Sequence, residues 1–120
     1  MASHNELGEK GEEIAHAHLI KNGYKMLERN WRFGKEEIDI IAQQGDELVV
    51  VEVKTRNSDF FGEPHQFVSK GKQNHLIRAA HAYIEKHDLD LEVRFDVIGI
   101  IVNAKTEKLE HIEGAFQPRW

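Results

Sequence analysis

Two acidic residues and a lysine stand in strand-forming surroundings where apolar residues alone would be expected. Asp39 interrupts an isoleucine-rich run, and Glu52 and Lys54 follow the apolar residues 48–51. Side chains alternate along a strand, so Glu52 and Lys54 are expected on one face, about 6.6 Å apart along the strand. A tight turn over 44–46 would fold Asp39 back beside them. The sequence therefore predicts that two carboxylates and one ammonium converge at one edge of a small sheet.

This grouping indicates a particular chemistry. Two neighbouring carboxylates repel each other unless a proton or a cation intervenes, and a hard divalent ion with oxygen ligands satisfies both. Mg²⁺ is the natural ion, with Mn²⁺ as its substitute. Such an ion binds a phosphate and a water and lowers the pKa of that water, while Lys54 orients the nucleophile or neutralises developing charge. The expected reaction is hydrolysis of a phosphodiester bond.

Glu12 is a further candidate for the metal site. It lies beside the apolar stripe of a helix expected over 6–22, from which its side chain can reach the sheet edge as a ligand or as a metal-positioning group. A simpler interpretation stays open, because an acidic residue near the start of a helix also favours the helix dipole. Gly8 and Gly11 are expected to let this helix approach the sheet closely.

The elements that must position these residues follow from the apolar periodicity. One helix is expected over 6–22, and a second runs from a cap at Ser69 to about residue 87. Strands are expected over 26–33, 37–42, 48–54, 92–102 and 109–112. The strand over 48–54 has the strongest apolar run and is expected to be central and covered on both faces. The predicted order is α-β-β-β-α-β-β, an α/β fold.

Composition bounds the remaining possibilities. A chain of 120 residues with 40% hydrophobic residues and two prolines is typical of a single globular domain, here 1–120. The absence of cysteine excludes disulfides, thiolate zinc sites and a cysteine nucleophile. No apolar stretch is long enough for a membrane helix and the polar start lacks a signal-peptide pattern, so we expect a cytoplasmic protein without a membrane partner.

The net charge of -5 argues against a nucleic-acid partner, but charge is sorted along the chain. Residues 21–35 carry +4, residues 36–53 carry -6 and residues 69–87 carry +3. The acidic stretch holds both expected metal ligands, so a bound divalent ion would move its charge toward neutral. From charge alone, ordinary solvated helix faces are the better explanation of the basic stretches. The candidates for phosphate contacts in and beside the basic stretches are Arg32, Lys35, Arg56, Lys70, Lys72 and Arg78.

Asp96 is another acidic residue in an apolar strand. It alternates with Phe95 and Val97, and we expect it to be a structural partner of an arginine outside the metal site. Arg94 is expected to reach only the opposite face of that strand.

As a set, these residues resemble the PD-(D/E)xK nuclease superfamily. More closely, they are similar to the small bacterial YraN-like family of predicted endonucleases, which are similar to archaeal Holliday-junction resolvases. The matching motifs are Gly8-x-x-Gly11-Glu12-x-x-Ala15, Asn30-Trp31-Arg32, Glu37-Ile38-Asp39-Ile40-Ile41-Ala42, Val51-Glu52-Val53-Lys54-Thr55-Arg56, Phe61-Gly62, Lys72-Gln73 and Arg94-Phe95-Asp96.

The resemblance implies a restriction-endonuclease-like three-layer fold, in which helices flank a mixed central sheet. It implies Asp39 and Glu52 as metal ligands, Lys54 as the catalytic lysine, Glu12 as an accessory acid and Gln73 near the site. It also implies DNA as the partner, branched or junction DNA above all. A homodimer follows from the same likeness, because symmetric cutting of two strands needs two sites, with the loop at Phe60 and Phe61 as its candidate interface.

Two other functions remain open from the sequence. A catalytically silent module on the same fold would bind nucleic acid through its basic residues and lose affinity with salt. An interaction protein would instead present Phe60, Phe61 and Trp120 to a partner and bind no metal.

Overall fold

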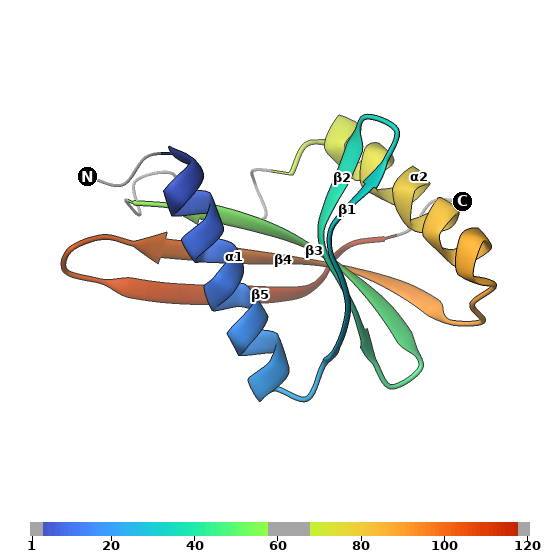
Figure 1. The fold of residues 1–120 in the computed structure, drawn as a ribbon, viewed down its shortest axis with the longest axis horizontal. Helices are drawn as coiled ribbons and strands as arrows, with labels where there is room; N and C mark the ends of the chain where they lie inside the picture. Colours follow the sequence, from blue (N-terminus) through green and yellow to red (C-terminus); the bar gives the residue numbers. More distant parts are fainter. Residues whose placement is uncertain (1–3, 58–67, 118–120) are drawn as a thin grey trace.

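The computed structural model describes residues 4–57 and 68–117 and arranges them as one five-stranded sheet with two helices (Figure 1). The elements are α1 (His4–Lys21), β1 (Lys25–Phe33), β2 (Glu36–Gln44), β3 (Glu47–Arg56), α2 (Lys70–His87), β4 (Glu92–Val102) and β5 (Glu107–Phe116). The predicted order α-β-β-β-α-β-β is confirmed. Neither described helix is long and apolar enough to cross a membrane.

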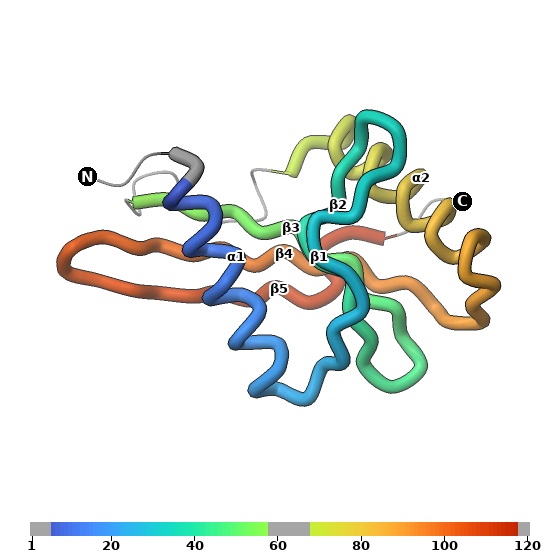
Figure 2. Tube along the Cα trace, in the orientation of Figure 1, coloured from blue at the N-terminus to red at the C-terminus, as the bar shows by residue number. Residues whose placement is uncertain are grey.

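The sheet is mixed, with the strand order β1-β2-β3-β4-β5. The pair β3 and β4 is parallel, and the other three pairs are antiparallel. The chain returns from the end of β3 to the start of β4 through the segment that contains α2, as the tube in Figure 2 shows. β3 is therefore the central strand, as its apolar run predicts.

Each face of the sheet carries its own hydrophobic core. On one face, Leu76 and Ala80 of α2 pack with Ile38, Val50 and Phe95 of the strands. The residues on the other face are Ala15 and Leu19 of α1 and, from the strands, Ile40, Val51 and Ile98. The two cores make three layers, helix, sheet and helix, which confirms the expected fold class.

The last strand is longer than predicted. β5 spans Glu107–Phe116 rather than residues 109–112. It lies at the edge of the sheet, and its charged residues alternate with half-buried apolar ones, so its apolar signal is weak. The expectations about Phe60, Phe61 and Trp120 fall outside the residues that the structure describes.

The contact between α1 and β3 depends on Gly11. A Cβ atom on Gly11 would lie 1.8 Å from Thr55 Oγ1, so the helix and strand meet where no side chain fits. The expectation for Gly8 is wrong, because nothing lies within 4 Å of the position of its Cβ atom. Of the two glycines, only Gly11 stands where the first half of α1 meets the end of β3.

Candidate active site

Asp39 occupies a break in the pleat of β2. Ile38 packs in the core on the α2 side, whereas Ile40 packs in the core on the α1 side. Residues two apart on a regular strand face the same way, so the alternation fails at Asp39. The ladder between β2 and β3 also ends here, because its last pair is Ile40 with Val51. The Asp39 side chain therefore stands where the two strands separate.

A hydrogen bond fixes the carboxylate in that gap. The backbone nitrogen of Val53 donates to Asp39 Oδ2 at 2.8 Å, replacing a strand-to-strand backbone bond. This contact holds Asp39 next to Glu52, as the hairpin geometry predicts. Burial, together with a hydrogen bond and charge repulsion from Glu52, raises the pKa of Asp39 to about 8, although the Val53 N–H and the charge of Lys72 act in the opposite direction. Near neutral pH without metal, the carboxyl pair therefore retains a proton.

Glu52 is the more deeply buried member of the pair, with 3% of its surface exposed. Lys72 of α2 places its Nζ atom 3.3 Å from Glu52 Oε2. This is a charge contact without hydrogen-bond alignment, and among the described residues no group donates a hydrogen bond to Glu52 Oε2. A buried carboxylate oxygen without a hydrogen bond is costly, so this atom is suited to accept a cation. Lys72, expected as a phosphate contact, instead lies beside an expected metal ligand.

Glu12 approaches the pair from α1. Burial raises the pKa of Glu12 and the charge of Asp39 raises it further, whereas a hydrogen bond with Asn30 lowers it. Asn30 lies opposite Asp39, because β1 and β2 pair Arg29 with Ile40 and Trp31 with Ile38. It has a φ of 53°, in the left-handed region that asparagine tolerates better than most residues. Asn30 thus holds Glu12 from the strand that faces Asp39.

Lys54 lies in a small pocket between α1 and the end of β3. The pocket has a volume of about 190 Å³, and its lining includes Gly8, Glu12, Lys54 and Arg56. Lys54 is half-buried, and the described residues give its ammonium no ion pair or hydrogen bond. Regular pairing of β3 with β4 as far as Arg56 keeps Glu52 and Lys54 on one face. The lysine and the accessory acid therefore line one pocket, next to the carboxyl pair.

The other expected site residues are spread around this centre. Gln73 follows Lys72 in α2, and its Nε2 atom donates to the Val68 carbonyl oxygen at 3.1 Å. Arg56 donates to the Thr55 carbonyl oxygen. The remaining phosphate-contact candidates lie on the surface: Lys35 and Lys70 are exposed, Arg32 pairs with Glu37 at 3.1 Å, and Arg78 pairs with Glu36 at 3.2 Å.

The donor set fits Mg²⁺. Asp39 and Glu52 supply hard carboxylate oxygens, and Glu52 Oε2 has no hydrogen bond from the described residues. No three acidic or histidine side chains in the described ranges come together as a ready metal cluster. Mg²⁺ is commonly bound through one or two carboxylates, with water and substrate phosphate as its other ligands, so a pair of carboxyl groups suits it.

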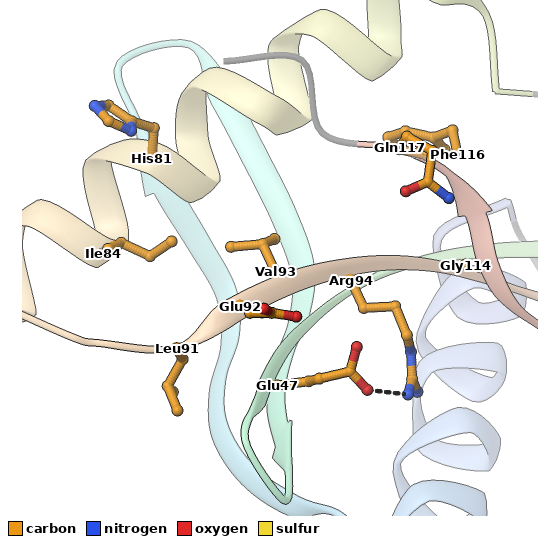
Figure 3. A pocket seen from close by; sticks show the side chains of 10 residues that line it. All are labelled: Glu47, His81, Ile84, Leu91, Glu92, Val93, Arg94, Gly114, Phe116 and Gln117. Atoms are coloured by element: carbon orange, nitrogen blue, oxygen red, sulfur yellow. Dashed lines mark hydrogen bonds and ion pairs between the residues drawn. The ribbon is translucent and has the colours of Figure 1, made fainter.

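A larger pocket lies at the opposite end of β3 and β4, with a volume of about 840 Å³ (Figure 3). Arg94 lines it, but five hydrogen bonds occupy its guanidinium: two go to Asp96 and the others to Gln44, Glu47 and Tyr24. Arginine has five N–H donors, so this residue has none left for a ligand. Figure 3 shows the guanidinium meeting Glu47, away from the α2 residues of the pocket.

The expectation that Arg94 faces away from Asp96 is wrong. Residues two apart on a strand share a face, and Arg94 binds both Asp96 carboxylate oxygens at 2.9 Å. His111 lies 2.7 Å from the same carboxylate, and His18 lies 3.0 Å from the other nitrogen of His111. Burial alone raises the pKa of Asp96, but hydrogen bonds from His111 and Arg94 hold it below its ordinary value. The structural role expected for Asp96 agrees with this network.

Two residues near the site make contacts that the sequence did not predict. Asn30 is an asparagine inside a strand, where this residue is depleted, and that is a signal for a special backbone position. The sequence predicts Lys72 as a phosphate contact but gives no sign of its contact with Glu52, because a lysine in the first turn of a helix is ordinary. Only the packing of α2 on the sheet brings it to Glu52.

The fold and the site together define an α/β/α protein with a buried carboxyl pair at the end of its central strand. The model of the family described as "Uncharacterised protein family UPF0102" matches residues 11–100. A UPF0102 protein of Flavobacterium psychrophilum is 51% identical, covering 97% of this chain and 98% of the relative. One from Christiangramia forsetii is 49% identical with the same coverage. The chain belongs to the UPF0102 family, the YraN-like group that its motifs resemble.

Among solved structures, the chain is similar to one described as Pyrococcus furiosus SfsA in complex with Ca²⁺. The similarity has a TM-score of 0.39 and 16% identity, and it covers 89% of this chain and 62% of that one.

Proposed function

We propose that this protein is a Mg²⁺-dependent nuclease that hydrolyses phosphodiester bonds in DNA, branched DNA above all. One observation carries the proposal: a buried pair of carboxyl groups, Asp39 and Glu52, at the end of the central strand, where Glu52 Oε2 accepts no hydrogen bond from the described residues. Lys72 supplies one positive charge beside Glu52, yet the pKa of Asp39 stays raised, so the pair is suited to a further cation.

Each residue of the site has a role in this proposal. Asp39 and Glu52 hold the ion, and the Val53 nitrogen orients the Asp39 carboxylate. A bound Mg²⁺ supplies Lewis-acid polarisation of the phosphate and a water of lowered pKa. Lys54 orients the attacking water or neutralises charge on the phosphate, from a position that no described ion pair restrains. Glu12, held by Asn30, serves as an accessory acid next to Lys54.

The remaining basic residues bind the substrate. Lys72 stands next to Glu52 and meets the phosphate that enters the site. Arg32, Lys35, Arg56, Lys70 and Arg78 contact the backbone further out, and Gln73 supports the first turn of α2 by its bond to Val68. Contacts of this kind fix the register of a nucleic acid without reading its sequence.

A cleavage assay tests the proposal. The chain is incubated with end-labelled four-way junction, flap and plain duplex DNA, with Mg²⁺, with Mn²⁺ and with EDTA. We expect metal-dependent cleavage that Asp39→Asn and Lys54→Ala abolish. Asp46→Asn, an exposed aspartate in the β2–β3 turn, and Lys108→Ala on β5 are matched controls that retain it. Activity that survives both Asp39→Asn and Lys54→Ala would rule the mechanism out.

A catalytically silent nucleic-acid-binding module is the second candidate. The contact between Lys72 and Glu52 favours it, because this ammonium already supplies positive charge to the buried carboxylate. The module predicts salt-dependent DNA binding that loses about one unit of log–log slope for each phosphate contact removed, as in Arg78→Ala. Cleavage that requires Asp39 excludes this candidate.

A further inference from the structure

The surface between the β1–β2 hairpin and α2 carries an exposed aromatic side chain. Phe33, the last residue of β1, is 44% exposed, and among the residues that the structure describes only Ile20 is another exposed large apolar side chain. It lines a pocket of about 790 Å³ whose other walls come from α2. The α2 residues are Ile77, Arg78, His81, Ala82, Glu85 and Lys86. This space, the Phe33 pocket, has apolar walls and a charged rim.

Phe33 is supported from inside the fold. The ring of Trp31 lies parallel to it, with 4° between the planes and 6.4 Å between the centroids. Tyr83 of α2 meets Trp31 edge-on, with 5.1 Å between their centroids. Trp31 and Tyr83 both belong to the core region on this side of the sheet. The Phe33 ring is therefore the outermost member of an ordered aromatic stack and costs little conformational entropy to use in binding.

Basic side chains surround this aromatic surface. Arg78 and Lys86 line the pocket, and Lys35 follows Phe33 by two residues in the sequence. These residues come from the two basic stretches, 21–35 and 69–87, which are far apart in the chain. Figure 2 shows the β1–β2 hairpin beside α2, and the ion pair between Arg78 and Glu36 joins them.

Both acidic groups beside the pocket have partners. Glu36 pairs with Arg78 and also contacts His75, and Glu85 contacts His81; the two histidine contacts are ion pairs only when the imidazole is protonated. Lys35 and Lys86 have no ion pair among the described residues, so positive charge is in excess at the rim. An aromatic surface with a cationic rim is the combination that binds single-stranded nucleic acid: bases stack on the ring while phosphates meet the lysines and arginines.

The same helix connects this pocket to the buried carboxyl pair. Lys72, in the first turn of α2, contacts Glu52, and Arg78 follows six residues later. At 1.5 Å per residue this is about 9 Å along the helix axis. An unpaired strand can stretch beyond the B-form spacing of about 3.4 Å per nucleotide, so about 9 Å corresponds to up to about three nucleotide steps.

We infer that the Phe33 pocket binds an unpaired nucleobase within about three nucleotides of the phosphate that occupies the site at Glu52. This inference rests on the proposed function and narrows its substrate class to DNA with a single-stranded segment beside the cleaved bond. A base inside a duplex presents only its edge, whereas an unpaired base can turn its face to an aromatic ring. The pocket therefore selects flaps, gaps or opened branch points over continuous duplex.

Binding measured without divalent metal tests this inference, since it requires no cleavage. The full chain with Trp120→Phe leaves Trp31 as its only tryptophan, and the probes are a 12-nucleotide single strand containing 2-aminopurine and the matching duplex, both in EDTA. We expect the single strand to quench Trp31 fluorescence and to bind more tightly than the duplex.

Substitutions at Phe33 then separate stacking from simple apolar contact. Phe33→Ala should weaken single-strand binding by about 5- to 150-fold, the range for base–aromatic stacking, and Phe33→Leu should weaken it nearly as much. Phe33→Trp should preserve it, and none of the three should change duplex affinity. Ile20→Ala, at an apolar residue of α1 that is 54% exposed, is the matched control and should bind like the parent.

Several outcomes would overturn the inference. One is that Phe33→Ala loses equal affinity for the single strand and the duplex, and another is that it binds the single strand like the parent. A third is that Phe33→Ala changes only the sedimentation of the protein, which would assign this face to a second copy of the chain. Failure of the nuclease proposal looks different: Phe33-dependent binding persists while no metal produces cleavage. Conversely, cleavage of duplex and flap at equal rates, with no effect of Phe33→Ala, leaves the nuclease intact and rejects the pocket.

Discussion

Asp39 Oδ2 accepts a hydrogen bond from the backbone nitrogen of Val53, the residue that follows Glu52, at 2.8 Å. One carboxylate thereby closes the gap between two separating strands and stands next to a second carboxyl group. This hydrogen bond joins the two strands, and it also holds two carboxyl groups close enough to repel each other. That repulsion makes the site suited to a cation.

Asp39→Asn should stabilise the metal-free protein at pH 8. The amide keeps an oxygen for the Val53 nitrogen and removes the repulsion from Glu52. The pKa of Asp39 is about 8 in the folded protein, and its ordinary value, 3.8, applies to the unfolded chain. Between pH 3.8 and pH 8 the folded state therefore binds more protons than the unfolded state. The contribution of Asp39 to the free energy of unfolding is therefore fully present below pH 3.8. It falls by up to about 1.4 kcal/mol per pH unit as the pH rises toward 8. Urea unfolding at pH 5 and pH 8 measures the difference.

The control for this experiment is Asp46→Asn, an exposed aspartate at the other end of the same hairpin, which should leave the pH dependence unchanged. A steeper loss of stability with pH in Asp39→Asn than in the parent would contradict the assignment.

Divalent-ion binding should strengthen as pH rises from 6 to 8. The proton shared by Asp39 and Glu52 competes with the ion, so affinity should rise by up to about tenfold per pH unit and level off above pH 8. Calorimetry with Mg²⁺ and the electron paramagnetic resonance of free Mn²⁺ measure it directly. Glu52→Gln should remove most of the binding, and an affinity independent of pH would count against this pair as the ligands.

Lys72→Met should destabilise the metal-free protein by about 1–2 kcal/mol, since Glu52 then keeps a buried charge without its cation. The partial exposure of Lys72 holds the effect below that of a fully buried pair. In Lys72→Met/Glu52→Gln the loss should largely disappear, and saturating Mg²⁺ should restore the stability of the single variant. Thermal and urea unfolding of the parent, both single variants and the double variant test this coupling, with Lys108→Met as the matched control. If the losses in unfolding free energy of the two single variants simply add up in the double variant, the two residues act independently.

Gly11→Ala should cost about 1–3 kcal/mol or more, because its Cβ atom would overlap Thr55 Oγ1. Gly8→Ala, in the same helix with open space around it, should cost nothing and even stabilise α1 by up to about 1 kcal/mol. Melting temperatures of the two variants make the comparison, and Thr55→Ala should recover part of the loss in Gly11→Ala. Equal melting temperatures for the two alanine variants would mean that α1 does not rest on Thr55.

Much of this fold follows from sequence periodicity. The apolar run before Glu52 predicts a central strand, and hairpin geometry then brings Asp39 next to Glu52. The break of the pleat at Asp39 could not be predicted, because it depends on which core Ile38 and Ile40 each enter. Lys72 was assigned to phosphate rather than to Glu52 for a similar reason: charge counts along a chain do not say which side chains meet across a layer.

The parallel pairing of β3 with β4 has a consequence for the order of folding. Glu47 pairs with Glu92, forty-five positions later, so the sheet is completed only by a long-range closure that includes α2. Such non-local pairing slows folding because loop entropy is lost before contacts form. Glu12, Asp39 and Glu52 all leave the ribosome before Lys72. An incomplete chain therefore exposes its acidic residues to water, and the carboxyl pair becomes buried only when the second half of the protein docks.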